Sequence, residues 1–184
     1  MDVQPAGCPR RLNAFTLVEL IITLVVTIVV LSVAVPGYRS LAAGSITTAV
    51  NSMAAHLHLA RSEAIKRGIQ VVLCPSTDGK TCLDRFEWQE GFIVYADVNG
   101  NRKPDEKDQM LRFHQPDSRR IRILTSTGRK KLVYQPSGMS PGSTATITVC
   151  DTTRYASPRA IVVSNTGRPR LSDTRPDGGA LRCG

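Results

Sequence analysis

The sequence predicts an α+β fold in which one long N-terminal helix packs on antiparallel β-sheet. Three observations predict it. Residues 15–35 form a mostly apolar run, apolar residues at helical spacing continue towards Gly68, and the pattern then changes to short β-branched and aromatic runs between turn residues. At 184 residues, the chain has room for one compact domain and an anchoring segment, which argues against a two-domain enzyme.

The apolar run of residues 15–35 is long enough to cross a hydrocarbon core of about 30 Å as a helix. Arg10 and Arg11 precede it, so the positive-inside rule places the N-terminus in the cytoplasm and the rest of the chain outside. A second interpretation stays open, because Ser32-Val33-Ala34 also fits a signal peptidase site, and cleavage there would release a secreted protein.

Glu19 is the acidic exception in this run. A carboxylate in a membrane helix costs about 2.5–3.5 kcal/mol on insertion scales, so we expect it to have a purpose. An α-amino group created by cleavage just upstream could neutralise it. A carboxylate that snorkels to the interface is the alternative.

The helix is expected to continue outside the membrane, with one apolar stripe facing a sheet. The stripe consists of Leu41, Ile46, Val50, Met53, Leu57, Ala60 and Ala64. His56 and His58 are about 200° apart on a helix, so they are not expected to bind one metal ion. Antiparallel strands are expected over residues 69–74, 92–95, 110–114, 121–124, 132–135, 144–149 and 160–164.

Charge is distributed unevenly along the chain. The net charge is +9, and residues 110–184 hold 13 Lys or Arg against 4 Asp or Glu, so the whole excess lies in this part. Such a concentration suits a phosphate-rich or anionic-membrane partner, although it also favours solubility. Five cysteines are an awkward number in an oxidising compartment, but cleavage near Phe15 would remove Cys8 and leave four, enough for two disulfides with three possible connectivities.

The segment Ala14-Phe15-Thr16-Leu17-Val18-Glu19 resembles the G-F-T-L-x-E signal of type IV pilins and type II secretion pseudopilins, with Ala14 in place of the usual glycine. The resemblance implies that a prepilin peptidase cuts between Ala14 and Phe15 and methylates the new amine. It also implies that Glu19 pairs with the N-terminus of a neighbouring subunit during assembly. The expected organisation is a leader over residues 1–14, a membrane and assembly segment over 15–36, and an extracytoplasmic pilin domain over 37–184.

A finer resemblance is to the FimT/FimU and GspH group of minor pilins and pseudopilins. The features that carry it are Cys74-Pro75-Ser76 with Cys82, Trp88 and Gly91 before an apolar strand, Asp97-Val98-Asn99-Gly100-Asn101, and Cys150 with Cys183. This resemblance implies the pilin-like version of the α+β fold. It also implies a Cys74–Cys82 bridge and a Cys150–Cys183 bridge that restrains the basic C-terminal segment.

Gly167-Arg168-Pro169-Arg170 is the candidate binding motif. In an extended strand the two arginines point the same way about 6–7 Å apart, and each guanidinium offers donors that suit phosphate oxygens. The tetrapeptide alone is equally typical of a solvated hairpin tip. Its position matches the G-R-x-R motif of FimT-like pilins, which implies sequence-independent binding of transforming DNA, with further contacts expected from Arg154, Arg159, Arg175 and Arg182.

Asp97, Asn99, Asn101 and Asp105 alternate in a manner that suggests a calcium loop. Glycine stands at the fourth position rather than the sixth, and Arg102 and Lys103 add repelling charge, so the sequence favours a polar hairpin turn. The sequence shows no catalytic set, and it predicts a protein that is not an enzyme and needs no metal or cofactor.

The sequence thus predicts a minor type IV pilin that captures DNA for natural transformation. Its expected partners are DNA, other major and minor pilins, the prepilin peptidase and the inner membrane. Its expected location is the inner membrane, with the C-terminal domain in the periplasm and later at the cell surface in the pilus. The alternative is a FimU-like or GspH-like subunit that primes or caps a pilus or a type II secretion pseudopilus without binding DNA.

Overall fold

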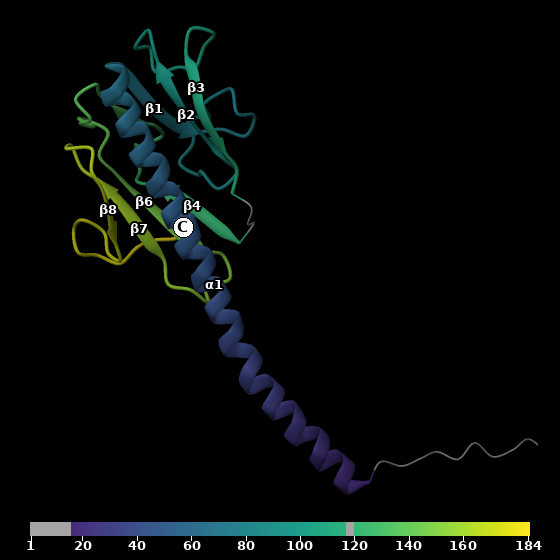
Figure 1. Cartoon of the computed structure of the whole chain (residues 1–184). Coiled ribbons are helices and arrows are strands. Elements are labelled where there is room, and N and C mark those ends of the chain that lie inside the picture. The colour runs from purple at the N-terminus through teal and green to yellow at the C-terminus, as the bar shows by residue number, and fades with distance from the viewer. Residues whose placement is uncertain (1–15, 117–119) are drawn as a thin grey trace, which may run out of the picture. The chain divides into compact units, whose positions relative to one another are not determined.

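The computed structural model describes residues 16–116 and 120–184, and over residues 33–41 it describes the backbone only. The described residues form one helix, α1 (Leu17–Arg67), followed by eight strands (Figure 1). The chain divides into two compact units between Tyr38 and Arg39, each of which is described by itself. The helix continues through this division, so each unit holds part of it.

The N-terminal part of α1 is apolar on all sides. Thr16 caps the helix, because its Oγ1 accepts a hydrogen bond from the Glu19 N–H (3.3 Å), and Glu19 stands at the third helical position typical of a capping box. Large apolar side chains from Leu17 to Leu31 are at least half exposed. The hydroxyls of Thr23 and Thr27 donate to main-chain carbonyls of the preceding turn. This surface therefore presents few polar groups that lack a partner within the helix.

Over the residues whose side chains the structure describes, no helix combines the length and the apolar character needed to cross a bilayer. Ala14 and Phe15, the expected cleavage site, lie outside the described residues. The side chains of residues 33–36, which complete the expected membrane segment, are also outside the described set.

In the second unit, α1 buries the predicted apolar stripe from Ile46 to Ala64, while the side chain of Leu41, the first predicted member, lies outside the described set. Ile46, Val50, Met53, Leu57, Ala60 and Ala64 are all at most 2% exposed. The helix ends at Arg67, and Gly68 follows with φ of 67° while its N–H donates to the Ala64 carbonyl (3.0 Å). This is the left-handed C-terminal cap that glycine adopts without strain, so the expected helix end is confirmed.

The strands form two four-stranded antiparallel sheets, with the orders β3-β2-β1-β5 and β4-β6-β7-β8. Seven of the eight overlap the seven predicted runs. Their bounds are β1 (Gln70–Pro75), β2 (Phe92–Asp97), β3 (Gln109–His114), β4 (Ile121–Thr125), β5 (Leu132–Tyr134), β6 (Ala145–Asp151), β7 (Arg159–Val163) and β8 (Pro169–Ser172). The additional strand, β8, lies at the edge of the second sheet and begins with Pro169, a position where a missing N–H is tolerated.

The main core lies between the helix of the second unit and one face of each sheet. Its apolar cluster includes Leu57 from α1, Leu73 from β1, and Ile147 and Ile161 from β6 and β7. Trp88 is also fully buried there, and its main-chain N–H donates to the Ile123 carbonyl (2.8 Å), which ties the segment before β2 to the edge of the second sheet. The predicted α+β fold is confirmed. The outer face of the second sheet lies on the side away from the helix.

Candidate nucleic-acid interface

The two arginines of the candidate motif lie at the β7–β8 hairpin. The Gly167 N–H donates to the Ser164 carbonyl (2.9 Å) and closes the turn between the strands. In the register, Val162 is opposite Arg170 and Ile161 is opposite Leu171. Because Ile161 belongs to the core, Val162 and Arg170 face the other side of the sheet.

Arg168 precedes the strand by one residue, and the spacing of two places its side chain on the same side as Arg170. Both side chains are exposed. Within residues 16–116 and 120–184, neither guanidinium forms an ion pair. Two adjacent cations thus remain available to an external anion.

Gly167 does more than form a turn. It is buried and has φ of 73°, and a Cβ built there would lie 2.1 Å from the Gly138 carbonyl oxygen. Only a residue without a side chain can bring the two main chains so close. The glycine of the motif is therefore required for packing of the hairpin against the turn that contains Gly138.

That neighbouring turn is itself fixed to the core. The Arg61 Nε of α1 donates to the Gly138 carbonyl (3.0 Å). The Ser140 N–H donates to the Asn165 carbonyl (2.9 Å), and the buried Ser140 hydroxyl donates to the Val133 carbonyl (2.9 Å). The loop before Arg168 is consequently held by the helix and by β5, so the two arginines project from a restrained backbone.

The C-terminal tail follows the outer face of the same sheet. A disulfide joins Cys150 on β6 to Cys183, and a second joins Cys74 to Cys82. These are the pairings that the family resemblance implies. A groove with a volume of about 500 Å³ lies beside the tail, and its lining includes Thr146, Thr148, Arg175 and Arg182.

The other four arginines predicted to contact DNA differ in whether an acidic side chain pairs with them. Arg159 pairs with Asp173 (Nε to Oδ1, 3.2 Å), and Arg175 pairs with Asp177, so part of their charge is neutralised locally. Arg182 and Arg154 are exposed and form no ion pair in the described part of the chain. Of the six predicted arginines, Arg168 and Arg170 are the two that share one side of a strand without an ion pair in the described part of the chain.

Arg154 stands in a turn built around Asp151, which ends β6 next to Cys150. Arg154 has φ of 61°, an uncommon conformation for a residue with a side chain. The Asp151 carboxylate is 7% exposed and accepts hydrogen bonds from Thr153, Tyr155 and Ala156. Burial by itself would raise the pKa of Asp151, but these hydrogen bonds outweigh it and lower the pKa below its ordinary value.

The sequence reasoning overlooked Arg122. It lies on β4 opposite Cys150, and its guanidinium nitrogens are 3.2–3.3 Å from the position that a Cβ on Gly184 would take. Arg122 therefore adds a positive charge to the outer face beside the end of the tail. Its position between the core residues Ile121 and Ile123 was the available signal, because alternate residues of a strand face opposite sides.

Comparisons with known proteins agree with this architecture. The family model described as type II transport protein GspH matches residues 49–167. No curated protein sequence gives a significant match.

Among solved structures, the type IV minor pilin FimU of Pseudomonas aeruginosa is similar in two crystal forms. One has 18% identity and a TM-score of 0.57, covering 76% of this chain and 94% of FimU, and the other has 20% identity and a TM-score of 0.54, covering 74% and 97%. The minor pseudopilin EpsH of the Vibrio cholerae type 2 secretion system is 14% identical with a TM-score of 0.50, covering 70% of this chain and 96% of EpsH. At sequence identities of 14–20%, the structural similarity shows only that these proteins share a fold with this chain.

A helix packed on two antiparallel sheets is the fold that the chain shares with these minor pilin and pseudopilin structures. The chain belongs to the GspH family, whose model covers well over half of it. The match ends at Gly167, so Arg168, Arg170 and the disulfide-bonded tail lie beyond it.

Proposed function

We propose that this minor pilin or pseudopilin binds DNA through Arg168 and Arg170, and that it captures DNA for natural transformation. The supporting observation is a pair of exposed guanidiniums that form no ion pair with any described residue, on a hairpin fixed by the close approach of Gly167 to Gly138. A restrained backbone loses little conformational entropy when the arginines bind, so more of the electrostatic attraction appears as affinity.

Binding is expected to depend on phosphate contacts rather than on base edges. The outer face carries arginines and threonines, and Tyr155 is the one aromatic residue of residues 151–184, which leaves little basis for stacking. If three or four phosphates are neutralised on duplex DNA, log affinity falls with log salt at a slope of roughly −3 to −4. Each arginine removed from the contact flattens that slope by about one.

The test is a fluorescence anisotropy titration of a labelled DNA duplex with the full-length protein in detergent micelles, at several salt concentrations. Arg168→Ala combined with Arg170→Ala is expected to weaken binding about tenfold or more at low salt and to flatten the slope by about two. The matched control removes two charges from exposed lysines elsewhere, Lys66→Ala with Lys80→Ala. Equal affinity of the arginine variant and the unaltered protein would refute the proposal.

A structural role in assembly is the second candidate function, and the apolar surface between Leu17 and Leu31 favours it. Large exposed apolar surfaces mark membrane or protein contacts. On this proposal the prepilin peptidase cuts before Phe15, the helix anchors the chain in the inner membrane, and Glu19 meets the N-terminus of a neighbouring pilin. The protein acts by binding and assembly rather than by catalysis.

Two measurements separate these roles. Mass spectrometry of the mature protein distinguishes a start at methylated Phe15 from a start at Val35, and the latter would contradict the pilin anchor. In cells, the double arginine variant is expected to assemble pili but to lose DNA uptake. Loss of both properties together would favour a purely structural subunit.

A further inference from the structure

The hairpin loop between β2 and β3 has the layout of a twelve-residue calcium loop. From Asp97 as the first position, oxygen-bearing side chains occur at positions 1, 3, 5, 9, 10 and 12, and all but Glu106 at position 10 match ligand positions: Asp97, Asn99, Asn101, Asp105 and Asp108. In the calcium loop of the EF-hand, ligands come from positions 1, 3, 5, 9 and 12, with a main-chain carbonyl from position 7 and a glycine at position 6 for the sharp turn.

The conformation of the sixth residue answers the main objection raised by the sequence, which is that no glycine stands at this position. It holds Arg102 rather than glycine, but Arg102 has φ of 59° and so adopts the left-handed conformation that the turn needs. Its N–H donates to Asp97 Oδ2 (2.8 Å). The Asn101 side chain likewise accepts from the Lys103 N–H (2.6 Å), so the side chains at positions 1 and 5 fold inward over the loop.

Asp97 supplies an independent indication of a ligand. It is 1% exposed, and its Oδ1 has no hydrogen-bond partner among the described residues, while Oδ2 is occupied by Arg102. A buried carboxylate oxygen without a donor is costly unless a cation compensates it. The Asp108 carboxylate accepts from two main-chain groups of the same loop, the Val98 N–H at Oδ1 (2.9 Å) and the Asp105 N–H at Oδ2 (3.1 Å).

We propose that this loop binds a calcium ion through Asp97 Oδ1, the Asn99 and Asn101 amide oxygens, the Lys103 carbonyl, and the carboxylates of Asp105 and Asp108. Counted by Asp, Glu, His and Cys side chains alone, no described group of three or more is arranged to hold a metal. Asp97, Asp105 and Asp108 therefore do not already converge as a metal centre, and the ion has to draw them together. The other half of the proposed donors are amide or main-chain oxygens, and each amide oxygen keeps a second lone pair for the ion.

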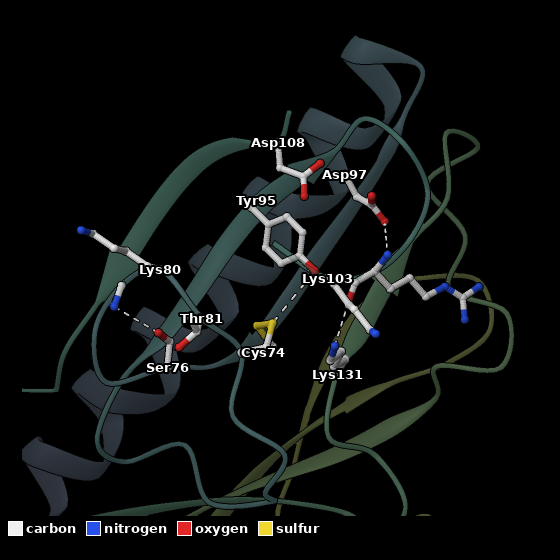
Figure 2. The surroundings of a disulfide bond; sticks show 12 residues. Cys74, Ser76, Lys80, Thr81, Tyr95, Asp97, Lys103, Asp108 and Lys131 are labelled. Carbon is white, nitrogen blue, oxygen red and sulfur yellow. Dashed lines mark hydrogen bonds between the residues drawn. A yellow bond between two sulfur atoms is a disulfide. The ribbon is translucent and has the colours of Figure 1, made fainter. Parts of the chain in front are cut away.

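Closure around the ion requires a small rearrangement. The amide nitrogens of Asn99 and Asn101 donate to Asp105 Oδ2 at 2.7 and 2.8 Å, and these bonds give way when Asp105 turns to the ion. Arg102, Lys103 and Lys107 offset much of the acidic charge, while Lys131 Nζ donates to the Arg102 carbonyl (2.7 Å) and steadies the turn (Figure 2). The expected dissociation constant is on the order of 10⁻⁴ to 10⁻³ M, the range of extracellular calcium modules.

The test uses the full-length protein in detergent micelles, with calcium chloride added after removal of metals by a chelator. Isothermal titration calorimetry is expected to show one bound ion, and terbium luminescence sensitised by Tyr95 should be quenched by competing calcium. Asp108→Asn is expected to weaken binding about tenfold or more. Glu106→Gln is the matched control, because it removes one negative charge from position 10, which is not a ligand position, and it should retain binding.

Two results would overturn the proposal. One is the absence of binding heat or luminescence from the unaltered protein at 10-fold the expected dissociation constant, on the order of 10 mM. The other is an equal loss of affinity in Asp108→Asn and Glu106→Gln, which would indicate a diffuse ion atmosphere. Trp88 fluorescence verifies that each variant is folded, and magnesium at the same concentration should bind more weakly, because the loop offers flexible oxygen ligands rather than a rigid octahedron.

Discussion

Replacing Gly167 by alanine should disturb the hairpin that carries the two arginines. At φ of 73° a residue with a Cβ costs about 1–2 kcal/mol. In addition, the new Cβ would lie 2.1 Å from the Gly138 carbonyl oxygen, so the two main chains must separate by about 1 Å to reach even a tight contact. Forced backbone shifts of this kind cost about 1–3 kcal/mol. The expected loss of stability is therefore about 2–5 kcal/mol in total.

Gly142→Ala is the matched control for this variant. Gly142 has φ of 67°, and a Cβ there would meet no atom within 4 Å, so only the conformational cost of about 1–2 kcal/mol applies. Thermal unfolding can be followed by the fluorescence of Trp88, the single tryptophan of the chain, which is fully buried. With about 2–4 °C per kcal/mol, Gly167→Ala should unfold about 4–20 °C below the unaltered protein.

The comparison also tests the argument behind the binding site. If Gly167→Ala and Gly142→Ala lower the unfolding temperature equally, the close approach to Gly138 does not stabilise the hairpin. In that case the view of Arg168 and Arg170 as residues on a restrained backbone fails. If the close approach is real, Gly167→Ala should also weaken DNA binding although both arginines are present.

Two further predictions concern the tail and the turn beside it. Replacing Cys150 and Cys183 by serine removes a disulfide between residues 33 apart in the sequence, and it should lower the free energy of unfolding by about 3–4 kcal/mol in the chain-entropy model. The loss should appear as a lower midpoint of denaturant unfolding, and an unchanged midpoint would contradict the prediction. Because the pKa of Asp151 is lowered in the folded state, its contribution is complete above about pH 3.9, the value of an unfolded Asp, and is lost as pH falls through the lower folded pKa. Asp151→Asn should lower the free energy of unfolding by about 1–3 kcal/mol at neutral pH. It should also make that free energy fall less between about pH 5 and 2, and an equal fall in the variant and the unaltered protein would refute the prediction.

Periodicity in the sequence was sufficient for most of the fold. The apolar stripe from Ile46 to Ala64 predicted the buried face of the helix, because residues three and four apart share one side. Short alternating or apolar runs predicted seven strands, because successive residues of a strand face opposite sides of the sheet. The eighth strand, β8, was not among the predicted strands, since a strand of four residues with a proline and an arginine at the edge of a sheet shows no hydrophobic pattern.

The candidate site was only partly accessible to sequence reasoning. The motif residues Gly167, Arg168 and Arg170 could be found from their order, because a spacing of two on extended chain needs no tertiary information. Arg122 was overlooked, since its place beside the C-terminus depends on a strand pairing between distant segments. The ion pairs of Arg159 and Arg175 with acidic tail residues were likewise outside what spacing alone predicts.

By itself the sequence determined the order of helix and strands, the direction of the charge gradient and the identity of the arginine motif, because these depend on neighbours within a few residues. Only the tertiary structure decided why Gly167 must be glycine, which arginines form no ion pair with a described residue, and that the buried Asp97 has a carboxylate oxygen without a partner among those residues. Those properties depend on contacts between segments that are far apart in the chain, and a local pattern of residues does not predict such contacts.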